Sequence, residues 1–233
     1  MKRLALVVFA LAIIFPAVAE EDYVALLKSK VPGWERYTTG QFAPMYEPLA
    51  QQMVQDYGLR DGVAIEIGSS CSPFLLHLAR RTKMTCYALD IDPWAMRLLG
   101  VFADQAGLTE RVVPVWGDVQ SLPFRDNFAD FIFSRGSIPF WHDQVKGLRE
   151  CYRVLKPGGV GYIGHGGFGR LLSAEDRQKM VEWRLGWGPQ EENRPQGWRG
   201  PKERMLTMAA EIGMREAKLV TEPDVGWWLE FRK

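Results

Sequence analysis

Residues 63–79 have the sequence VAIEIGSSCSPFLLHLA, and the rest of the chain is organised around them. The apolar run Val63–Ile67, interrupted only by Glu66, predicts a buried strand of a parallel sheet. A turn of small residues follows, and Pro73 suits the first position of a helix that Ser72 caps. Strand, tight turn and helix in this order predict the opening unit of a nucleotide-binding α/β fold, whose ligands sit beyond the carboxyl ends of the strands.

Glu66 is the most informative residue of this stretch. A carboxylate at the end of a buried strand is unfavourable unless a partner satisfies it. One such partner would be the ammonium group of a bound ligand, and the alternative is a neighbouring backbone amide. The turn argues against a dinucleotide, because G-x-G-x-x-G starting at Gly68 would need glycines where the chain has Ser70 and Pro73. A ligand without phosphates fits this turn better.

The composition indicates one ordinary core and no bulk affinity for nucleic acid. The chain has 233 residues, 47% of them hydrophobic, which is enough for one core and too little for two comfortable domains. Lys+Arg is 29 and Asp+Glu is 28, so no excess of basic charge indicates nucleic acid. The three cysteines, an odd number, do not indicate a disulfide framework, and no metal-ligand spacing such as CxxC or HExxH occurs, so no metal is expected.

Residues 1–19 are typical of a signal peptide or an N-terminal anchor. Lys2–Arg3 form a basic start, Leu4–Phe15 an apolar stretch, and Ala17–Ala19 a small-residue cleavage site. The apolar stretch is short for a membrane span, which takes about 20 residues. We therefore expect an exported or membrane-tethered protein, periplasmic in a bacterium, whose membrane contact runs only through residues 1–19.

The remaining chain alternates strands and helices, which predicts an open, mostly parallel sheet with helices on both faces and a final antiparallel hairpin. Residues 20–60 are expected to form an N-terminal helical cap, which either covers the ligand pocket or simply packs, and residues 61–233 the main domain. Residues 186–201 have the composition of a long loop. With Trp183, Trp187 and Trp198, this loop either forms a lid over an apolar substrate or packs onto the body.

Acidic residues follow the expected second and third strands. Asp90 lies 24 positions after Glu66, where a carboxylate can accept hydrogen bonds from both hydroxyls of a ribose. Asp118 comes just after the next strand, and it either accepts from an exocyclic amine such as that of adenine or bonds its own backbone in a turn.

Candidate substrate contacts follow the fourth and fifth strands, because the loops after strands carry function in this class of fold. Arg135, Trp141 and His142 follow the fourth strand, and His165 lies near the end of the fifth. The alternative is that the arginine is structural and the histidines are ordinary surface residues.

Five pieces in order carry a resemblance to a known family: EIGSS at 66–70, ALDIDP at 88–93, GDVQSLPFRDNFADFIFS at 117–134, SRGS at 134–137 and LRECYRVLKPGGVGYI at 148–163. With these, the sequence resembles the class I S-adenosylmethionine-dependent methyltransferases over about residues 45–233. Within that class it is most similar to the small-molecule branch that includes the quinone-biosynthesis methyltransferases (methyltransferase type 11). The resemblance implies a Rossmann-like, doubly wound sheet of seven strands.

The resemblance also implies a cofactor, S-adenosylmethionine, and a residue set to hold it. Its methionine part would be held by Glu66 and Gly68, its ribose by Asp90, and its adenine by Ile91, Asp118 and Val119, with Ser70 and Ser134 completing the set. Ser70 and Ser72 depart from the glycine-rich turn that is usual in the family. A serine fits there unless the backbone needs a positive φ, which would weaken cofactor binding.

The implied activity is in-line transfer of a methyl group to a small-molecule acceptor, with the rate coming mostly from close alignment of the two reactants. A base is needed only where the acceptor must lose a proton, and His142 and His165 are the candidates.

S-adenosylmethionine is made in the cytosol, whereas residues 1–19 predict export. An uncleaved anchor that leaves the domain on the cytoplasmic side would resolve this conflict. The alternative function is an exported, non-catalytic binding protein on a methyltransferase scaffold. A nicotinamide oxidoreductase is disfavoured by the turn after Ile67.

Overall fold

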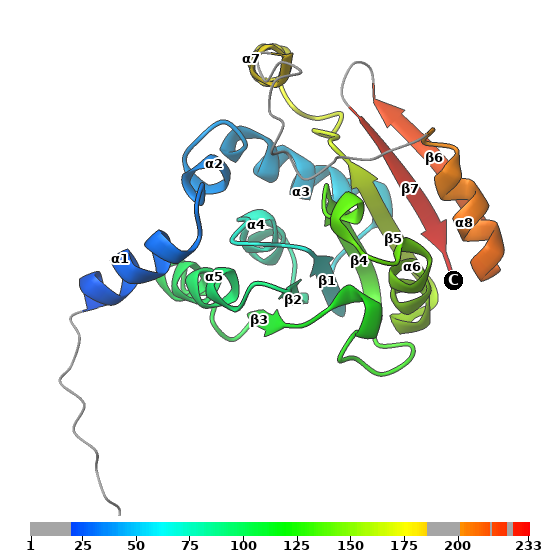
Figure 1. The fold of residues 1–233 in the computed structure, drawn as a ribbon, viewed down its shortest axis with the longest axis horizontal. Coiled ribbons are helices and arrows are strands. Elements are labelled where there is room, and N and C mark those ends of the chain that lie inside the picture. The colour runs from blue at the N-terminus through cyan, green and yellow to red at the C-terminus, as the bar shows by residue number, and fades with distance from the viewer. Residues whose placement is uncertain (1–19, 186–200, 215, 223–225) are drawn as a thin grey trace, which may run out of the picture.

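The computed structural model describes residues 20–185, 201–214, 216–222 and 226–233 (Figure 1). The expected signal segment 1–19, most of the expected lid loop with Trp187 and Trp198, and the expected turn at Pro223–Asp224 lie outside the described residues. None of the helices formed by the described residues combines the length and the apolar character needed to span a membrane.

One seven-stranded sheet forms the centre of the molecule, in the strand order β3-β2-β1-β4-β5-β7-β6. The first five strands run parallel, β7 runs antiparallel to β5, and β6 runs antiparallel to β7. This arrangement confirms the predicted Rossmann-like fold with its C-terminal hairpin. The strands are β1 Val63–Ile67, β2 Thr85–Asp90, β3 Val112–Trp116, β4 Ala129–Arg135, β5 Leu155–His165, β6 Glu216–Glu222 and β7 Gly226–Arg232.

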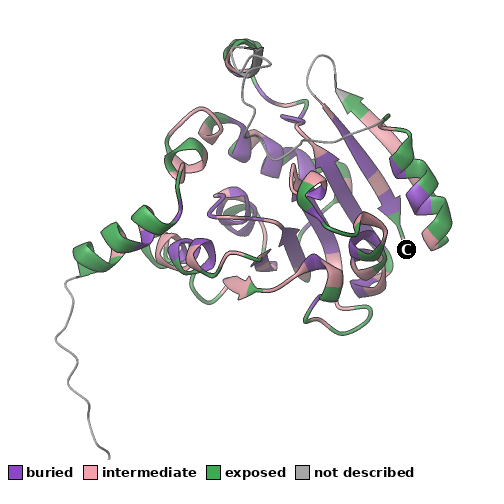
Figure 2. Cartoon of the chain, in the orientation of Figure 1, coloured by how far each residue is buried: buried purple, intermediate pink, exposed green. Residues whose placement is uncertain are grey.

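Helices cover both faces of this sheet. One hydrophobic layer packs α3, α4 and α5 on the sheet, and a second layer packs α6 and α8 on the opposite face (Figure 1). Figure 2 shows the central strands as the most deeply buried part of the chain. The helices are α1 Glu20–Lys30, α2 Glu35–Thr38, α3 Ala43–Tyr57, α4 Phe74–Arg81, α5 Pro93–Gln105, α6 Gln144–Val154, α7 Ala174–Leu185 and α8 Arg204–Ile212, with short 3-10 turns η1 Val119–Ser121 and η2 Ile138–Phe140.

The alternation of side chains along the strands decides which polar residues share a face. Ala64 of β1 and Phe133 of β4 belong to the layer of α3 and α4, so Glu66 and Arg135, two residues further along, point to the same side. Because the carboxyl ends of parallel strands meet at one edge of the sheet, Glu66, Asp90 and Arg135 end up along that edge.

Local sequence signals fix the starts of two helices. The pair Asp92–Pro93 predicts a helix start with Asp92 as its N-cap, and the structure confirms this, since Asp92 Oδ1 accepts the N–H of Trp94 at 2.8 Å. The helix predicted to begin at Pro73 begins instead at Phe74, although Ser72 Oγ still accepts the Phe74 N–H at 3.2 Å. The α4 boundary therefore moves by one residue without loss of the capping interaction.

The fifth strand is longer than predicted. The glycines before Val160 predict a strand over Val160–Gly164, but the strand starts at Leu155, which pairs with Ala129 of β4. The Gly158 N–H also donates to the Lys233 carbonyl at 2.6 Å. The pairing with β4 is irregular between Leu155 and Val160, and Gly158 has a φ of +80°, so the Pro-Gly-Gly segment makes a local turn within the strand that the hydrogen bond to Lys233 holds in place.

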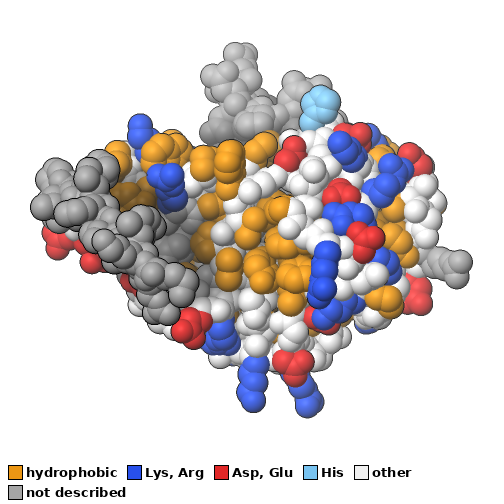
Figure 3. All heavy atoms as spheres, turned by 90° about the horizontal axis from the view of Figure 1, so that it is seen from below, with side chains coloured by type: hydrophobic (Ala, Val, Ile, Leu, Met, Phe, Trp, Pro, Cys, Tyr) orange, Lys and Arg blue, Asp and Glu red, His pale blue; other side chains and the backbone are white. Residues whose placement is uncertain are grey.

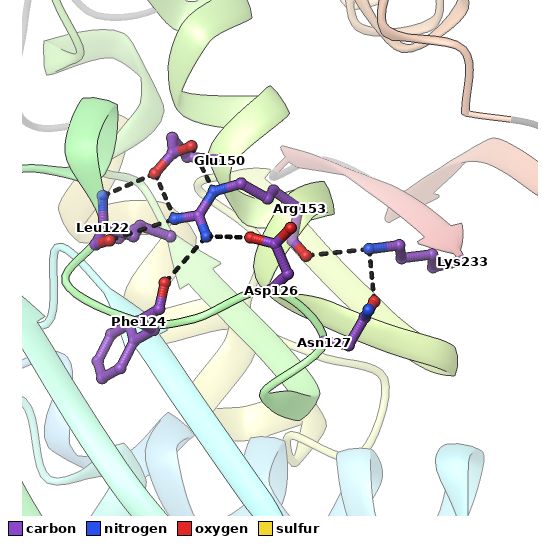
Figure 4. A network of polar contacts seen from close by, with 7 residues as sticks. All are labelled: Leu122, Phe124, Asp126, Asn127, Glu150, Arg153 and Lys233. Atoms are coloured by element: carbon purple, nitrogen blue, oxygen red, sulfur yellow. Dashed lines mark hydrogen bonds and ion pairs between the residues drawn. The ribbon is translucent and has the colours of Figure 1, made fainter.

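The connection from β3 to β4 contains only the short turn η1, and Arg153 of α6 fastens it (Figure 4). The guanidinium donates to the carbonyls of Leu122 and Phe124 at 3.2 and 3.0 Å and pairs with Asp126 at 2.6 Å and Glu150 at 2.7 Å. Glu150 in turn accepts the Leu122 N–H at 2.9 Å. This network fixes the connection between β3 and β4, whose first residues, Gly117 and Asp118, lie beside the carboxyl ends of the central strands.

Aromatic side chains pack beneath the same connection. Phe124 stacks on Phe128 with ring centroids 5.3 Å apart, and both rings contact Tyr87 of β2. Seen from below, the face of the molecule that carries β3 and this connection has hydrophobic side chains gathered near its middle (Figure 3). The loop is thus held by polar contacts to α6 and by apolar contacts to the sheet.

Candidate functional site

A cavity of about 360 Å³ lies beyond the carboxyl ends of β1, β2 and β4. Small-molecule sites in proteins have volumes of roughly 300–1,000 Å³, so this cavity can hold a nucleoside-sized ligand. Its walls are formed by the turn after β1, the ends of β2 and β4, the segment 117–120, the β4–α6 connection and two tyrosines from α2 and α3.

Most residues predicted for the site meet in this cavity. Those that line it are Glu66, Gly68, Ser70, Asp90, Ile91, Asp118, Val119, Arg135, Trp141 and His142. Two predicted residues are not among the lining residues. Ser134 is fully buried with its Oγ 2.6 Å from that of Ser137, and half-buried His165 has its ring 6.0 Å from that of Trp227. The placement of Ser134 and His165 does not support direct ligand contact, whereas the roles of the lining residues stay predictions.

Glu66 places a carboxylate deep in the cavity wall, with only 3% of the residue exposed. Its Oε1 accepts a hydrogen bond from Ser72 Oγ at 3.1 Å, whereas the buried Oε2 has no hydrogen-bond partner among the described residues. Burial raises the pKa of Glu66 well above its ordinary value, and nearby Asp90 raises it further, although the Ser72 hydroxyl acts in the opposite direction. An ammonium group at Oε2 would satisfy this oxygen and favour the charged form.

Asp90 holds the turn after β1 as well as facing the cavity. Its Oδ2 accepts the Ser70 N–H at 2.7 Å and its Oδ1 the Asp92 N–H at 2.9 Å. Burial raises the pKa of Asp90, and these two backbone N–H groups counteract that rise. Each carboxylate oxygen has a second acceptor position, so hydroxyls of a ligand can still be bound there.

Ser70 has a φ of +46°, the left-handed conformation that glycine adopts more easily. The sequence analysis stated that a positive φ at this serine would weaken cofactor binding, and the backbone does have a positive φ here. The conformation turns the Ser70 N–H toward Asp90, where the 2.7 Å hydrogen bond offsets part of the strain. The turn keeps its shape with a serine at this position.

Gly68 and Ser137 bring the tips of β1 and β4 together. Gly68 has a φ of +65°, and a Cβ at this position would lie 2.2 Å from the Cβ of Ser137. The Ser137 Oγ donates to the Ile67 carbonyl at 3.2 Å, accepts from Trp141 Nε1 at 3.0 Å and bonds the Ser134 hydroxyl. Sequence reasoning missed Ser137, whose only signal was its place in the SRGS segment. Ser134 was predicted to contact the cofactor, whereas in the structure its hydroxyl bonds that of Ser137.

Asp118 makes the turn interaction that was the alternative interpretation of this residue. Its Oδ1 accepts the Gln120 N–H at 2.8 Å, and the Gln120 amide donates to both carboxylate oxygens at 3.2 and 3.1 Å. Asp118, Val119 and Ile91 nevertheless line one end of the cavity, and Ile91 is 69% exposed at its rim. Apolar Ile91 and Val119 next to a carboxylate suit a purine ring with an exocyclic amine.

Tyr37 of α2 and Tyr46 of α3 also line the cavity, as do Arg135 and residues 140–142 of the β4–α6 connection. Burial raises the pKa of both tyrosines, so their hydroxyls stay protonated at neutral pH. The sequence left open whether the helical segment 20–60 covers the ligand pocket or simply packs; α3 packs into the core, and Tyr37 and Tyr46 from this segment line the cavity. Sequence reasoning found the helix but not these tyrosines, since Tyr46 lies among apolar residues that the helical pattern explains.

No group of three or more His, Cys, Asp or Glu side chains in the described part of the chain is arranged to hold a metal ion.

Comparison with known proteins identifies similar sequences and folds. Residues 65–163 match the family model described as Methyltransferase domain. A crystal structure of a protein from Methanococcus maripaludis, assigned as an S-adenosyl-L-methionine-dependent methyltransferase, is 32% identical to this chain. The match covers 89% of this chain and 93% of that one, with a TM-score of 0.76.

Two curated relatives are similar over shorter stretches. The demethylmenaquinone methyltransferase of Staphylococcus aureus is 30% identical over 114 residues, which are 47% of this chain and 46% of the relative. The chloroplastic 2-methyl-6-phytyl-1,4-hydroquinone methyltransferase of Arabidopsis thaliana is 53% identical over 45 residues, which are 19% of this chain and 13% of the relative. The chain thus spans less than half the length of each of these two relatives.

Proposed function

The chain belongs to the class I S-adenosylmethionine-dependent methyltransferases, and from this premise we propose that it transfers a methyl group to a small, planar acceptor. The observation that carries the proposal is one cavity lined by Glu66 of β1, Asp90 at the end of β2 and Asp118 just after β3, which are three neighbouring strands. The curated relatives named above act on demethylmenaquinone and on a phytyl hydroquinone, which are ring compounds. Exposed Phe140 and buried Trp141 give this cavity flat apolar surfaces suited to a ring.

The residues present fit the donor. The orphaned Oε2 of Glu66 suits the ammonium group of its amino acid, and Asp90 has acceptor positions left for the two ribose hydroxyls. The left-handed Gly68 lets Ser137 pack directly against the turn, which fixes the position of the turn beside Glu66. None of these positions offers the row of free N–H groups that a pyrophosphate would need, because Gly68 and Ser69 donate to the Leu89 carbonyl.

When bound, S-adenosylmethionine supplies a methyl group on a positively charged sulfur: the acceptor's electron pair bonds the methyl carbon as the carbon–sulfur bond breaks and leaves its electrons on sulfur. The protein's task is to hold both reactants in line and exclude water. Glu66 and Asp90 orient the donor from the β1 and β2 tips, while Trp141, held by Ser137, forms the wall on the acceptor side.

His142 is the histidine placed to take a proton from the acceptor. It lines the cavity and is exposed to solvent, so a proton can leave through it. The buried tyrosines stay protonated and can donate hydrogen bonds but not act as bases. An acceptor that carries no proton on the attacking atom would not need His142.

Calorimetry on the full-length chain tests the proposal. We expect S-adenosylmethionine and S-adenosylhomocysteine to bind at micromolar concentrations, and transfer of labelled methyl from the donor to hydroquinones to be detectable. A chain that binds neither nucleoside at millimolar concentration would refute the proposal and favour the exported binding protein. Substitution of His142 by Gln should lower turnover without changing donor affinity.

We also propose that residues 1–19 direct this domain to or across a membrane. The support is the sequence pattern alone, a basic start, an apolar stretch and a small-residue site before Glu20. Fractionation of a tagged chain, followed by N-terminal sequencing, tests this. An exported protein should begin at Glu20, an anchored one should keep Met1 in the membrane fraction, and an intact chain in the soluble fraction would contradict both.

A further inference from the structure

Gln120 joins two parts of the cavity wall that the proposed function treats separately. It follows Asp118 in the β3–β4 connection and lines the cavity, and His142 lines the same cavity from the β4–α6 connection. The side chain of Gln120 makes hydrogen bonds to both connections at once. We propose that Gln120 is a positioning residue, which couples the contact between Asp118 and the donor's adenine to the placement of His142. This inference rests on the proposed function.

The Gln120 amide lies between an acceptor and a donor, and its own two polar atoms match them. Its Nε2 donates to the two carboxylate oxygens of Asp118 at 3.2 and 3.1 Å, and its Oε1 accepts the Asp143 N–H at 2.9 Å. Turning the amide over would set its oxygen against a carboxylate and its NH₂ group against another N–H, so the partners determine its orientation. A glutamate of the same length lacks the donor, and a lysine lacks the acceptor.

His142 lies between two residues that are held in place. Trp141 on one side is buried, and its Nε1 donates to Ser137 Oγ at 3.0 Å. Asp143 on the other side is the N-cap of α6, and its own N–H donates to Gln120. Gln120 therefore fixes one of the two ends of the short piece of backbone that carries the His142 side chain.

The Asp118 carboxylate can take part in this link and still receive a ligand. Its Oδ1 accepts the Gln120 backbone N–H at 2.8 Å as well as the side-chain amide, whereas Oδ2 accepts, among the described residues, only the side-chain amide. Oδ2 therefore has an acceptor position left for an exocyclic amine. Hydrogen bonds in a chain polarise one another, so an amine that arrives at Oδ2 changes the Gln120 amide and, through it, the bond to the Asp143 N–H.

A second set of contacts joins the β3–β4 connection to α6 and does not involve the cavity. Arg153, near the end of α6, bonds the carbonyls of Leu122 and Phe124 and pairs with Asp126 (Figure 4). None of these four residues lines the cavity. A variant in this second set therefore separates a general loosening of the connection from the specific loss of the Gln120 link.

The test uses the full-length chain with three substitutions of Gln120. Gln120→Glu keeps an oxygen for the Asp143 N–H but sets a carboxylate against Asp118, Gln120→Lys keeps a donor for Asp118 but no acceptor, and Gln120→Met keeps neither. Asp126→Asn is the matched control, because it alters a contact between the same connection and α6 away from the cavity. The probes are adenosine and purine riboside, which differ only in the exocyclic amine. The readout is the NMR signal of the His142 ring, identified by its loss in His142→Gln.

In the wild type, adenosine should displace the His142 signal further than purine riboside does, because only adenosine brings an amine to Asp118. Direct contact between a nucleoside and the histidine is common to both probes, so it cancels in the comparison. The difference between the probes should vanish in all three Gln120 variants, since each of them breaks the link at one end or at both. It should persist in Asp126→Asn, which leaves the link intact.

Two results would overturn the inference. One is that adenosine and purine riboside displace the His142 signal equally in the wild type, and the other is that their difference survives in Gln120→Met. A wild type that binds neither these nucleosides nor S-adenosylhomocysteine would refute the proposed function instead. The backbone amide signal of Asp143 in the ligand-free chain then decides the inference. It should move in Gln120→Met and return toward its wild-type position in Gln120→Glu, and an unchanged signal in Gln120→Met would show that Gln120 does not hold this segment.

Discussion

Replacing Glu66 by Gln should weaken donor binding and, in the same protein, change how stability depends on pH. The substitution keeps the size of the side chain. It also keeps an oxygen that can accept from the Ser72 hydroxyl, which in the wild type lies 3.1 Å from Oε1. It removes the negative charge that the buried, unpartnered Oε2 presents to the cavity. The two effects have one physical origin, which is that the Glu66 carboxylate is buried and has one oxygen without a partner until a cationic ligand binds.

The effect on binding follows from the loss of one charge-assisted hydrogen bond. Such a bond contributes about 1.5–3 kcal/mol, so S-adenosylhomocysteine should bind roughly ten- to a hundred-fold more weakly to the variant. Methylthioadenosine lacks the amino acid and its ammonium group, so its affinity should not change. A comparison of the two ligands therefore separates the contact at Glu66 from any general damage to the cavity.

The effect on stability has a defined sign. In the unfolded chain Glu66 titrates at about 4.3, and in the folded protein burial raises its pKa well above that. At low pH the side chain is protonated in both states and makes no difference. As the pH rises from the pKa of Glu66 in the unfolded chain to its higher pKa in the folded protein, the unfolded chain releases its proton first. The free energy of unfolding therefore falls over this pH range. A glutamine cannot titrate, so the variant escapes this loss.

Urea unfolding at a series of pH values, run on wild type and variant side by side, measures this difference. We expect the variant to gain stability relative to the wild type as the pH rises, with Glu110→Gln, at an exposed position after α5, as a control that shows no such trend. Parallel pH profiles for wild type and Glu66→Gln, or equal loss of affinity for both nucleosides, would refute the reasoning.

Three further substitutions test the geometry of the cavity. Asp90→Asn should weaken S-adenosylhomocysteine and methylthioadenosine alike, by about ten-fold or more, because both contain the nucleoside; calorimetry that finds either unchanged would contradict the ribose assignment. Gly68→Ala places a Cβ 2.2 Å from that of Ser137 on a backbone with φ of +65° and should lower the free energy of unfolding by about 1–3 kcal/mol in urea; an unchanged midpoint would show that the turn relaxes freely. Gly147→Ala places a Cβ 2.7 Å from the ring of Trp141 and should shift the fluorotryptophan NMR signal that is lost in Trp141→Phe; a signal at its original position would mean that the ring does not pack on α6.

The sequence predicted the fold and most of the strand-tip residues that line the cavity, because both depend on local signals. A buried strand with a single acid, a turn of small residues and a second strand ending in Asp90 are adjacent to one another in the chain, and parallel pairing then brings the strand tips together. Asp92 was predicted correctly as a helix cap for the same reason, since the capping interaction reaches only two residues.

The two tyrosines of the cavity wall could not be predicted in this way. Tyr37 and Tyr46 reach the cavity from helices that precede β1, and no spacing in the sequence indicates which turn of those helices faces the strand tips. Ser137 was missed because its importance lies in contacts to β1 and to Trp141, which only the pairing of β1 with β4 creates. The extra length of β5 likewise depends on partners at the far end of the chain.

The hydrogen bonds of Asp90 have a consequence for how such an enzyme can be altered. One carboxylate shapes the turn through Ser70 and the start of α5 through Asp92, so replacing it changes the scaffold together with the nucleoside contact. In the segment 135–142, Ser137 has a similar double role, because its hydroxyl bonds the Ile67 carbonyl of β1 and the Trp141 indole. Mutant libraries aimed at new acceptors should therefore diversify Phe140 and His142, and leave Ser137 and the β2 tip untouched.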